Sequence, residues 1–201
     1  MRLFIAIQLN EAVKNALTEI QDALRRRGAG GNYTRLENLH LTLAFIGEYS
    51  DPDWVLEVMQ SVPFQPFDIR LEGFGCFGDL YWCGIGGHTE LTAYVQRLRR
   101  ALAEADIPFD RKRFSPHITL LRKATFRGNK MPGVIVPDAG MEVMRVSLMR
   151  SDRGCCRKRV DAGSTTLAIT SFSTVGATIW RHHPDRGKQG MIYTELDAVD
   201  V

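Results

Sequence analysis

Two five-residue stretches share one order of residue types, and this repeat constrains the fold more than any other feature of the chain. Residues 39–43 read Leu-His-Leu-Thr-Leu, and residues 116–120 read Pro-His-Ile-Thr-Leu. Side chains alternate faces along a β-strand, so each stretch predicts a strand with His and Thr on one face and aliphatic residues toward the core. Random placement gives roughly 0.06 such motifs in a chain of this composition, so two matches indicate a repeated structure.

The surroundings of the two motifs repeat as well. In each half a strand and an amphipathic helix precede the motif, and helix caps are expected at Asn10, Asp51 and Thr89. We therefore expect an α+β fold of two related lobes, each a small antiparallel sheet with helices on one face. The expected strands are 2–9, 39–46, 67–71, 80–85, 116–121, 141–149 and 191–196. The last two of these strands are expected to pair as neighbours in the second lobe.

His40 and His117, one from each motif, are the candidate catalytic residues. Displacement of an oxygen at phosphorus requires a base for the attacking group and an acid for the leaving oxygen. Two imidazoles on opposite sides of one phosphate can supply both, because an imidazole titrates near neutral pH. The alternative is a pair of structural histidines in a duplicated fold, since a neutral imidazole also serves as a hydrogen-bonded interior group.

Four further side chains are candidates for holding the phosphate. The hydroxyls of Thr42 and Thr119 can donate hydrogen bonds to its non-bridging oxygens. A guanidinium can offset the charge that accumulates there. Arg122 and Arg35 each lie five residues from a motif histidine, and both are candidates for this role.

The residue pattern does not favour a metal site or a nucleotide-binding glycine loop. His88 stands alone, His182-His183 are adjacent, and the four cysteines form neither a C-x-x-C pair nor a zinc spacing. Residues 73–78 space their glycines as G-x-G-x-x-G, but an expected strand follows them rather than a helix. We therefore expect no metal and no cofactor, and we interpret 73–78 as a connection between strands.

Composition narrows the class of protein. Hydrophobic residues make up 44% of the 201 residues and charged residues 24%, which is typical of a globular protein. No apolar run reaches the ~18–20 residues required to span a bilayer, and the apolar start of the chain meets polar residues too early for a signal peptide. We therefore expect a cytoplasmic protein that does not bind membranes. Segment 155–187 alone accounts for the net charge of +3, so any RNA affinity has to come from local sites.

The motifs with their flanks carry a resemblance to a known family. Residues 37–48 (ENLHLTLAFIGE) and 114–122 (FSPHITLLR) resemble the paired signatures of the two-histidine (2H) phosphoesterases. Within them the chain is most similar to the bacterial RNA 2′,3′-cyclic phosphodiesterases, long called 2′-5′ RNA ligases. The similarity covers roughly residues 1–154 and 188–197.

The resemblance implies a bilobal fold with a pseudo-twofold axis, a catalytic cleft between the lobes, and no metal. It implies that water opens a 2′,3′-cyclic phosphate to a 2′-phosphate, with His40 as general acid and His117 as general base. Thr42, Thr119 and Arg122 would then hold the phosphate. The expected partner is RNA with a cyclic phosphate end, or a small cyclic nucleotide, and the protein is expected to be a monomer. Stacking of a base would use Phe45, Trp82 or Phe114.

Two alternatives and one departure from the family pattern accompany this interpretation. The same site could serve 2′-5′ ligation as its main role, or the chain could be an RNA- or nucleotide-binding module without activity. In the family the last two strands follow each other almost directly, whereas here segment 155–187 intervenes. We expect one bilobal domain over residues 1–201, with 155–187 as an insertion outside the cleft.

Overall fold

The structure is a computed structural model that describes residues 1–87, 89–126, 133–153 and 191–200. Contacts divide the chain into two compact units, Met1–Asp152 with Ile192–Val201, and Arg153–Met191. The first unit contains both His-x-Thr motifs. The expected insertion at 155–187 lies outside the described residues. No helix in the described ranges is long and apolar enough to cross a membrane.

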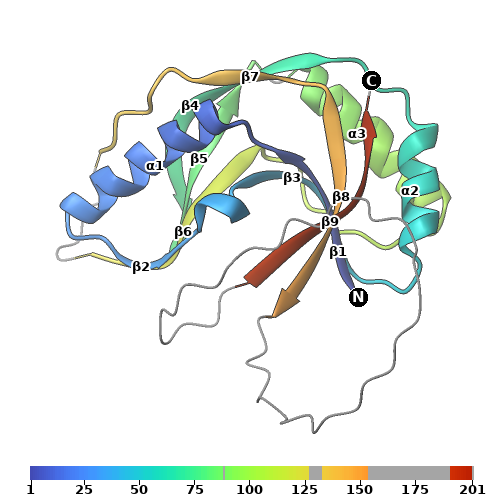
Figure 1. Ribbon diagram of the computed structural model, residues 1–201, viewed down its shortest axis with the longest axis horizontal. Helices are drawn as coiled ribbons and strands as arrows, with labels where there is room; N and C mark the ends of the chain where they lie inside the picture. Colours follow the sequence, from blue (N-terminus) through green and yellow to red (C-terminus); the bar gives the residue numbers. More distant parts are fainter. Residues whose placement is uncertain (88, 127–132, 154–190, 201) are drawn as a thin grey trace, which may run out of the picture. The chain divides into compact units, whose positions relative to one another are not determined.

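Two antiparallel sheets and three helices make up the first unit, which confirms the expected α+β class (Figure 1). The four-stranded sheet has the order β3 (His40–Glu48), β1 (Arg2–Gln8), β8 (Arg145–Arg153) and β9 (Met191–Asp200). The five-stranded sheet has the order β2 (Gly30–Tyr33), β6 (His117–Thr125), β5 (Leu80–Gly86), β4 (Phe67–Phe77) and β7 (Gly140–Val143). One His-x-Thr motif therefore lies in each sheet.

Two of the three expected helix N-caps are confirmed. The Asn10 side chain accepts a hydrogen bond at the start of α1 (Glu11–Arg26), and that of Asp51 does so at the start of α2 (Pro52–Ser61). The expectation for Thr89 is wrong, because Thr89 is the first residue of α3 (Thr89–Glu104). A short 3₁₀ helix, η1 (Leu36–Asn38), precedes β3. Helix α1 contacts β6 and β7, whereas α3 contacts α2, β3 and β4.

The expected single strand at 141–149 is wrong. The chain leaves the five-stranded sheet at Val143 and enters the four-stranded sheet at Arg145, so the segment forms β7 and β8 in different sheets. Val143 and Val146 are both buried, while Met144 and Arg145 between them are exposed, and this breaks the two-residue period. Strand β8 does neighbour β9 as expected, but in the sheet of β1 and β3 rather than in the second lobe.

Strand β2 is absent from the expected strands. It pairs with β6, and Gly31 has a φ of 135° in this pairing. A Cβ atom on Gly31 would lie 2.8 Å from the carbonyl oxygens of both Arg122 and Lys123. Glycine therefore allows a close approach of two backbones here.

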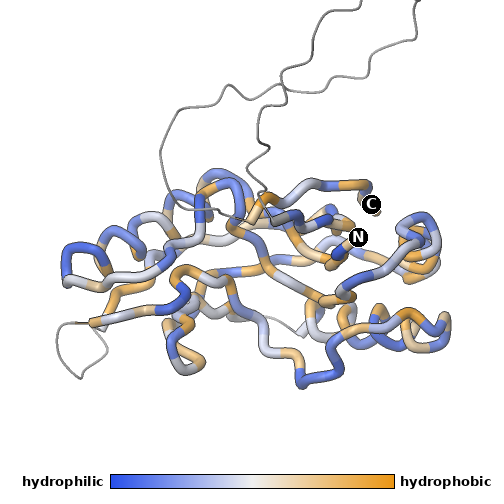
Figure 2. Tube along the Cα trace, turned by 90° about the horizontal axis from the view of Figure 1, so that it is seen from below, coloured by the Kyte–Doolittle hydropathy of each residue, from blue (hydrophilic) through white to orange (hydrophobic). Residues whose placement is uncertain are grey.

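Apolar side chains from both sheets and the three helices form one core cluster. Strand β1 is buried on both faces: Leu3, Ile5 and Ile7 join this core, while Phe4 and Ala6 form a second, smaller cluster. Hydropathy alternates along most helices and strands of the tube in Figure 2, as expected for elements with one core face. The second cluster lies on the face of β1 that leads to His40, since Phe4 contacts the His40 ring.

Candidate active site

Both motifs have the predicted division of faces. The aliphatic residues of the motifs, Leu41 and Leu43 on β3 with Ile118 and Leu120 on β6, are fully buried, and the His and Thr residues between them are half-buried. Strands β3 and β6 contact each other although they belong to different sheets. A cavity of about 40 Å³ opens where they meet, and it is lined by Thr34, Asn38, His40, Thr42, His117, Thr119, Arg122 and Tyr193.

The two imidazoles are oriented in the same way. His40 Nδ1 lies 2.8 Å from the carbonyl oxygen of Asn38, and His117 Nδ1 lies 2.7 Å from that of Ser115. A carbonyl only accepts hydrogen bonds, so each Nδ1 carries a hydrogen and donates it. Each Nε2 is then available for proton exchange. His40 Nε2 lies 3.1 Å from the hydroxyl oxygen of Thr42.

Two aromatic rings lie against His40. The His40 ring lies 5.0 Å from the Phe4 ring and 5.1 Å, edge-on, from the Tyr193 ring. Burial lowers the pKa of His40, and the positive charges of Arg122 and His117 lower this pKa further, against the raising effect of the bond to the Asn38 carbonyl. In the free protein the neutral form of His40 is therefore favoured.

A β-bulge brings Arg122 to the cavity. Strict alternation would place Arg122 on the face opposite His117 and Thr119. In the pairing of β5 with β6, however, Trp82 pairs with Thr119 and Tyr81 with Leu121, so Leu120 is an extra residue. The bulge reverses the alternation beyond Leu120, and Arg122 lines the same cavity as Thr119.

The other motif strand has a bulge at the equivalent place. Ala6 pairs with Thr42 and Ile5 with Ala44, so Leu43 is extra, three residues after its histidine as Leu120 is after His117. The Leu43 carbonyl accepts two hydrogen bonds from the Arg99 guanidinium, at 3.2 and 3.1 Å.

The carbonyl at the second bulge is bound by a helix in the same manner. The Leu120 carbonyl accepts one bond from Gln21 Nε2 at 3.0 Å and one from the Thr34 backbone at 2.9 Å. Gln21 and Arg99 occupy the same position in helices α1 and α3, which have 16 residues each. Each helix therefore holds the bulged strand of one motif through one side chain.

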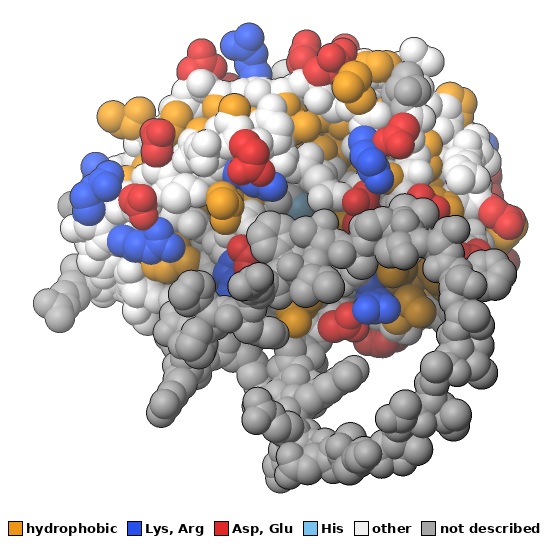
Figure 3. Space-filling view, in the orientation of Figure 1, with side chains coloured by type: hydrophobic (Ala, Val, Ile, Leu, Met, Phe, Trp, Pro, Cys, Tyr) orange, Lys and Arg blue, Asp and Glu red, His pale blue; other side chains and the backbone are white. Residues whose placement is uncertain are grey.

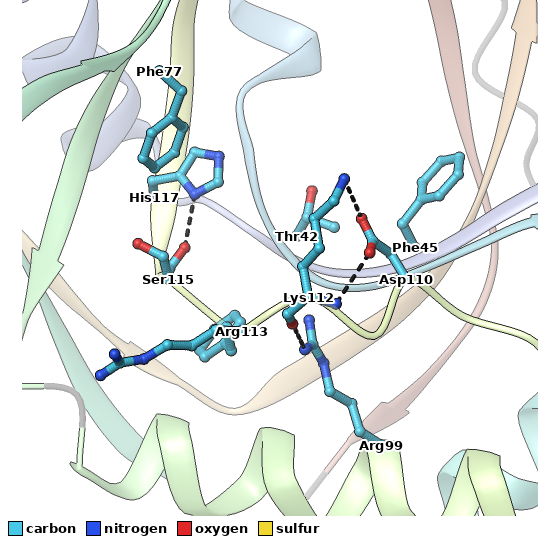
Figure 4. A pocket seen from close by; sticks show the side chains of 10 residues that line it. Thr42, Phe45, Phe77, Arg99, Asp110, Lys112, Arg113, Ser115 and His117 are labelled. Atoms are coloured by element: carbon cyan, nitrogen blue, oxygen red, sulfur yellow. Dashed lines mark hydrogen bonds and ion pairs between the residues drawn. The ribbon is translucent and has the colours of Figure 1, made fainter.

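A second, larger cavity of about 500 Å³ adjoins the first and shares Thr42 and His117 with it. It is lined by Thr42, Phe45, Phe77, Arg99, Asp110, Lys112, Arg113, Phe114, Ser115 and His117. In Figure 4, His117 and Phe77 lie on one side of this cavity, with Phe45 and Asp110 on the opposite side. Phe45 is a predicted substrate-binding residue, and the Arg2 guanidinium lies 4.9 Å from the centre of its ring.

The family model of the 2′-5′ RNA ligase superfamily matches residues 9–154 of the chain, a range that contains both His-x-Thr strands. The chain belongs to this superfamily. An RNA 2′,3′-cyclic phosphodiesterase of Thermotoga maritima is 36% identical over 132 residues, which cover 61% of this chain and 70% of that protein. A protein of the same name from Thermus thermophilus is 32% identical over 170 residues, covering 76% of this chain and 82% of that protein.

A solved structure of the superfamily shows the same fold. The crystal structure of E. coli LigT in its apo form superposes with a TM-score of 0.68 at 22% identity. The superposition covers 99% of this chain and 96% of that chain. This likeness confirms the expected two-sheet α+β architecture.

Arg35, a predicted phosphate-binding residue, lies away from both cavities. Its side chain is 58% exposed, lies 3.9 Å from the Glu37 carboxylate, and lines neither of the two cavities. Phe114 and Trp82 are expected, like Phe45, to stack with a base. Phe114 lines the larger cavity, and the Arg99 guanidinium lies 5.4 Å from the centre of its ring. Trp82 lies beside His117, with ring centres 6.2 Å apart, but lines neither cavity.

The glycines of residues 73–78 have a structural role. The interpretation as a strand connection is only partly right, because Gly73 and Gly75 lie within β4. Gly73 and Gly78 have φ values of 78° and 62°, which glycine adopts without strain. A Cβ atom on Gly75 would overlap the indole ring of Trp82. The glycine spacing therefore accommodates the aromatic ring next to His117.

Charges of both signs are mixed on the face of the molecule that Figure 3 shows. On the face drawn in Figure 3, Lys and Arg side chains are interspersed with Asp and Glu wherever side-chain types are shown. Within the described ranges, no three His, Cys, Asp or Glu side chains gather as metal ligands. Sequence reasoning missed three lining residues, Thr34, Asn38 and Tyr193. Asn38 directly precedes the first motif, whereas Thr34 and Tyr193 come from the segment before η1 and from β9, away from either motif.

Proposed function

We propose that the chain hydrolyses the 2′,3′-cyclic phosphate end of RNA to a 2′-phosphate, without a metal ion, using His40 and His117. The observation that carries this proposal is one cavity lined by both imidazoles, each of which donates its Nδ1 hydrogen to a backbone carbonyl. The names of the curated relatives support the reaction class. RNA is therefore the proposed substrate, and the protein requires no cofactor.

In the proposed reaction a water oxygen attacks phosphorus while His117 Nε2 accepts the water proton. The bond between phosphorus and the 3′ oxygen breaks, and His40 Nε2 donates its proton to that oxygen. Thr42, Thr119 and Arg122 donate hydrogen bonds to the non-bridging oxygens, where charge accumulates. The product is a 2′-phosphate and a free 3′ hydroxyl, and a proton passes from His117 to His40 before the next cycle.

The depressed pKa of His40 is compatible with its role as the acid. The bound phosphate is an anion beside His40, and a nearby negative charge favours the imidazolium. Substrate binding therefore promotes protonation of His40, against the burial that keeps it neutral in the free protein. Protonation and substrate binding are coupled in this site.

The test is incubation of purified protein with an oligonucleotide that ends in a 2′,3′-cyclic phosphate, in the presence of EDTA. Appearance of a 2′-phosphate end supports the proposal. A 3′-phosphate end, or activity that EDTA abolishes and zinc or magnesium restores, would contradict it. Addition of an acceptor with a 5′ hydroxyl tests 2′-5′ ligation, in which this hydroxyl replaces water as the nucleophile and the same two histidines serve as base and acid. Binding without any product would indicate a nucleotide-binding module.

A further inference from the structure

The two adjoining cavities differ in size by an order of magnitude. The cavity of about 40 Å³ around the histidines has space for a few water-sized groups, which suits one phosphate. The neighbouring cavity of about 500 Å³ has the size of a small-molecule site. Because the two share Thr42 and His117, a nucleotide with its cyclic phosphate in the first has its nucleoside in the second.

The larger cavity has three cationic side chains and one carboxylate, Asp110. The Arg99 guanidinium is bound to the Leu43 and Lys112 carbonyls, and burial lowers its pKa. The Lys112 ammonium lies 3.4 Å from the Asp110 carboxylate. Two of the three cations therefore already have partners.

Arg113 is the remaining cation of this cavity. Among the described residues, none forms a hydrogen bond or ion pair with its side chain. Figure 4 shows its guanidinium directed away from Asp110 and Lys112, on the side of Ser115 and His117. An unpaired guanidinium beside a nucleoside-sized cavity is suited to bind a phosphate with two parallel hydrogen bonds.

We infer that Arg113 binds the 5′ phosphate of the terminal nucleotide, so that the enzyme distinguishes an RNA end from a nucleoside cyclic phosphate. The inference rests on the proposed function. In RNA the 5′ phosphate of the last nucleotide is the linkage to the preceding one, and it lies one ribose away from the cyclic phosphate. A free nucleoside 2′,3′-cyclic phosphate lacks this group and leaves Arg113 without a partner.

The test compares adenosine 2′,3′-cyclic phosphate with its 5′-phosphorylated form as substrates. Wild type should show a kcat/KM about tenfold higher for the 5′-phosphorylated form, the effect expected of one charge-assisted hydrogen bond. Arg113→Ala should reduce this ratio to near one. Arg111→Ala is the matched control, because Arg111 belongs to the same loop but does not line the cavity, and it should retain the ratio. Added salt should lower the wild-type ratio.

Equal rates on the two substrates in wild type, or a preference that persists in Arg113→Ala, would overturn the inference. A parallel titration with adenosine 2′-phosphate and adenosine 2′,5′-bisphosphate separates it from the proposed reaction. Suppose that neither cyclic substrate is hydrolysed, but that the bisphosphate binds about tenfold tighter than adenosine 2′-phosphate in wild type and not in Arg113→Ala. This result would support the Arg113 subsite and contradict the proposed reaction. If hydrolysis occurs, but the 5′ phosphate changes neither the rate nor the affinity, the result would support the proposed reaction and contradict the Arg113 subsite.

Discussion

Gln21 Nε2 on helix α1 donates a hydrogen bond of 3.0 Å to the carbonyl oxygen of Leu120, the residue at which β6 bulges between His117 and Arg122. The same amide nitrogen donates to the Thr34 carbonyl at 2.8 Å. Gln21 is one of the few buried polar residues in the described chain, with 3% of its surface exposed. It therefore holds the strand geometry that brings Arg122 and Thr119 to one cavity.

Replacement of Gln21 by Met removes the donor and keeps a side chain of similar length. We expect the free energy of unfolding to fall by about 1–3 kcal/mol, because the Thr34 and Leu120 carbonyls each lose one hydrogen bond and the Leu120 carbonyl keeps that from the Thr34 backbone. We also expect a higher KM, because Arg122 is less well placed. Urea denaturation and steady-state kinetics measure the two effects. Gln8→Met is the control, since Gln8 is exposed and, within the described residues, its side chain bonds only the Ser147 hydroxyl. Equal stability of both variants would contradict the role of Gln21.

Replacement of His40 or of His117 by Ala should lower kcat by at least ~10²-fold, the lower end for loss of a positioned proton-transfer group. The double variant should lose far less than the product of the two single losses, because the two histidines act in one step. Turnover of a short cyclic-phosphate substrate measures all three variants. A single variant that retains nearly the wild-type rate would make that histidine a structural residue.

The pH dependence of kcat/KM follows from the depressed pKa of His40. In the active form one of the two imidazoles is protonated to the cation and the other is neutral. The fall in rate at low pH therefore reports the histidine with the lower pKa, whichever of the two is the acid. Burial lowers the pKa of His40 from 6.5, and the limb should therefore lie below pH 6.5. Rates between pH 4.5 and 9, with circular dichroism as the folding control, give the profile. An acidic limb at or above pH 6.5 would contradict the lowered pKa of His40. So would an NMR titration in which an imidazole resonance of low pKa persists in His40→Asn.

The structure adds Phe77 to the candidate stacking residues, and we expect the base to stack on it. Its side chain is 49% exposed at the end of β4, and its ring lies edge-on to the His117 ring at 5.2 Å. Stacking of a base on an aromatic ring contributes about 1–3 kcal/mol, so Phe77→Ala should raise KM about tenfold with little change in kcat. Trp54→Ala is the control, because Trp54 is also exposed but lines neither cavity. A fall in kcat at constant KM would instead indicate that Phe77 orients His117.

Segment 155–187 is predicted to be dispensable for catalysis. Strands β8 and β9 are neighbours in the sheet, so a direct join of Gly154 to Lys188 would connect them by a short loop. Loop-closure entropy changes only slowly with length, so the shortened chain should fold and keep a similar kcat on a short substrate. Circular dichroism and turnover check this. A deletion that fails to fold, or that folds and loses turnover, would show that the segment is integral.

The parts of the site that were predictable are those governed by local periodicity. Alternation within five residues was sufficient to place His40 and Thr42 on one face, and His117 and Thr119 likewise. The position of Arg122 depends on a bulge that only the pairing with β5 reveals, so its presence in the cavity was predicted but not its geometry.

Long-range pairing explains the errors in the fold. The two-sheet architecture followed from the repeat of strand, helix and motif. The assignment of the last strands to a lobe was wrong, because strands β8 and β1 pair across most of the chain length. Phe77 and Arg113 lie on loops and strand ends, where no periodicity marks a functional side chain.

Each imidazole is oriented by the carbonyl oxygen two residues before it in its own chain segment. Three consecutive residues, 38–40 or 115–117, therefore contain the hydrogen bond that selects the tautomer, while the packing of β3 against β6 sets the separation of the two rings. The tautomer is thus determined by local sequence, whereas the separation of the rings is determined by the tertiary structure. Substitutions in the core between the sheets can thus change the distance between the two rings without changing which nitrogen of either ring carries the hydrogen.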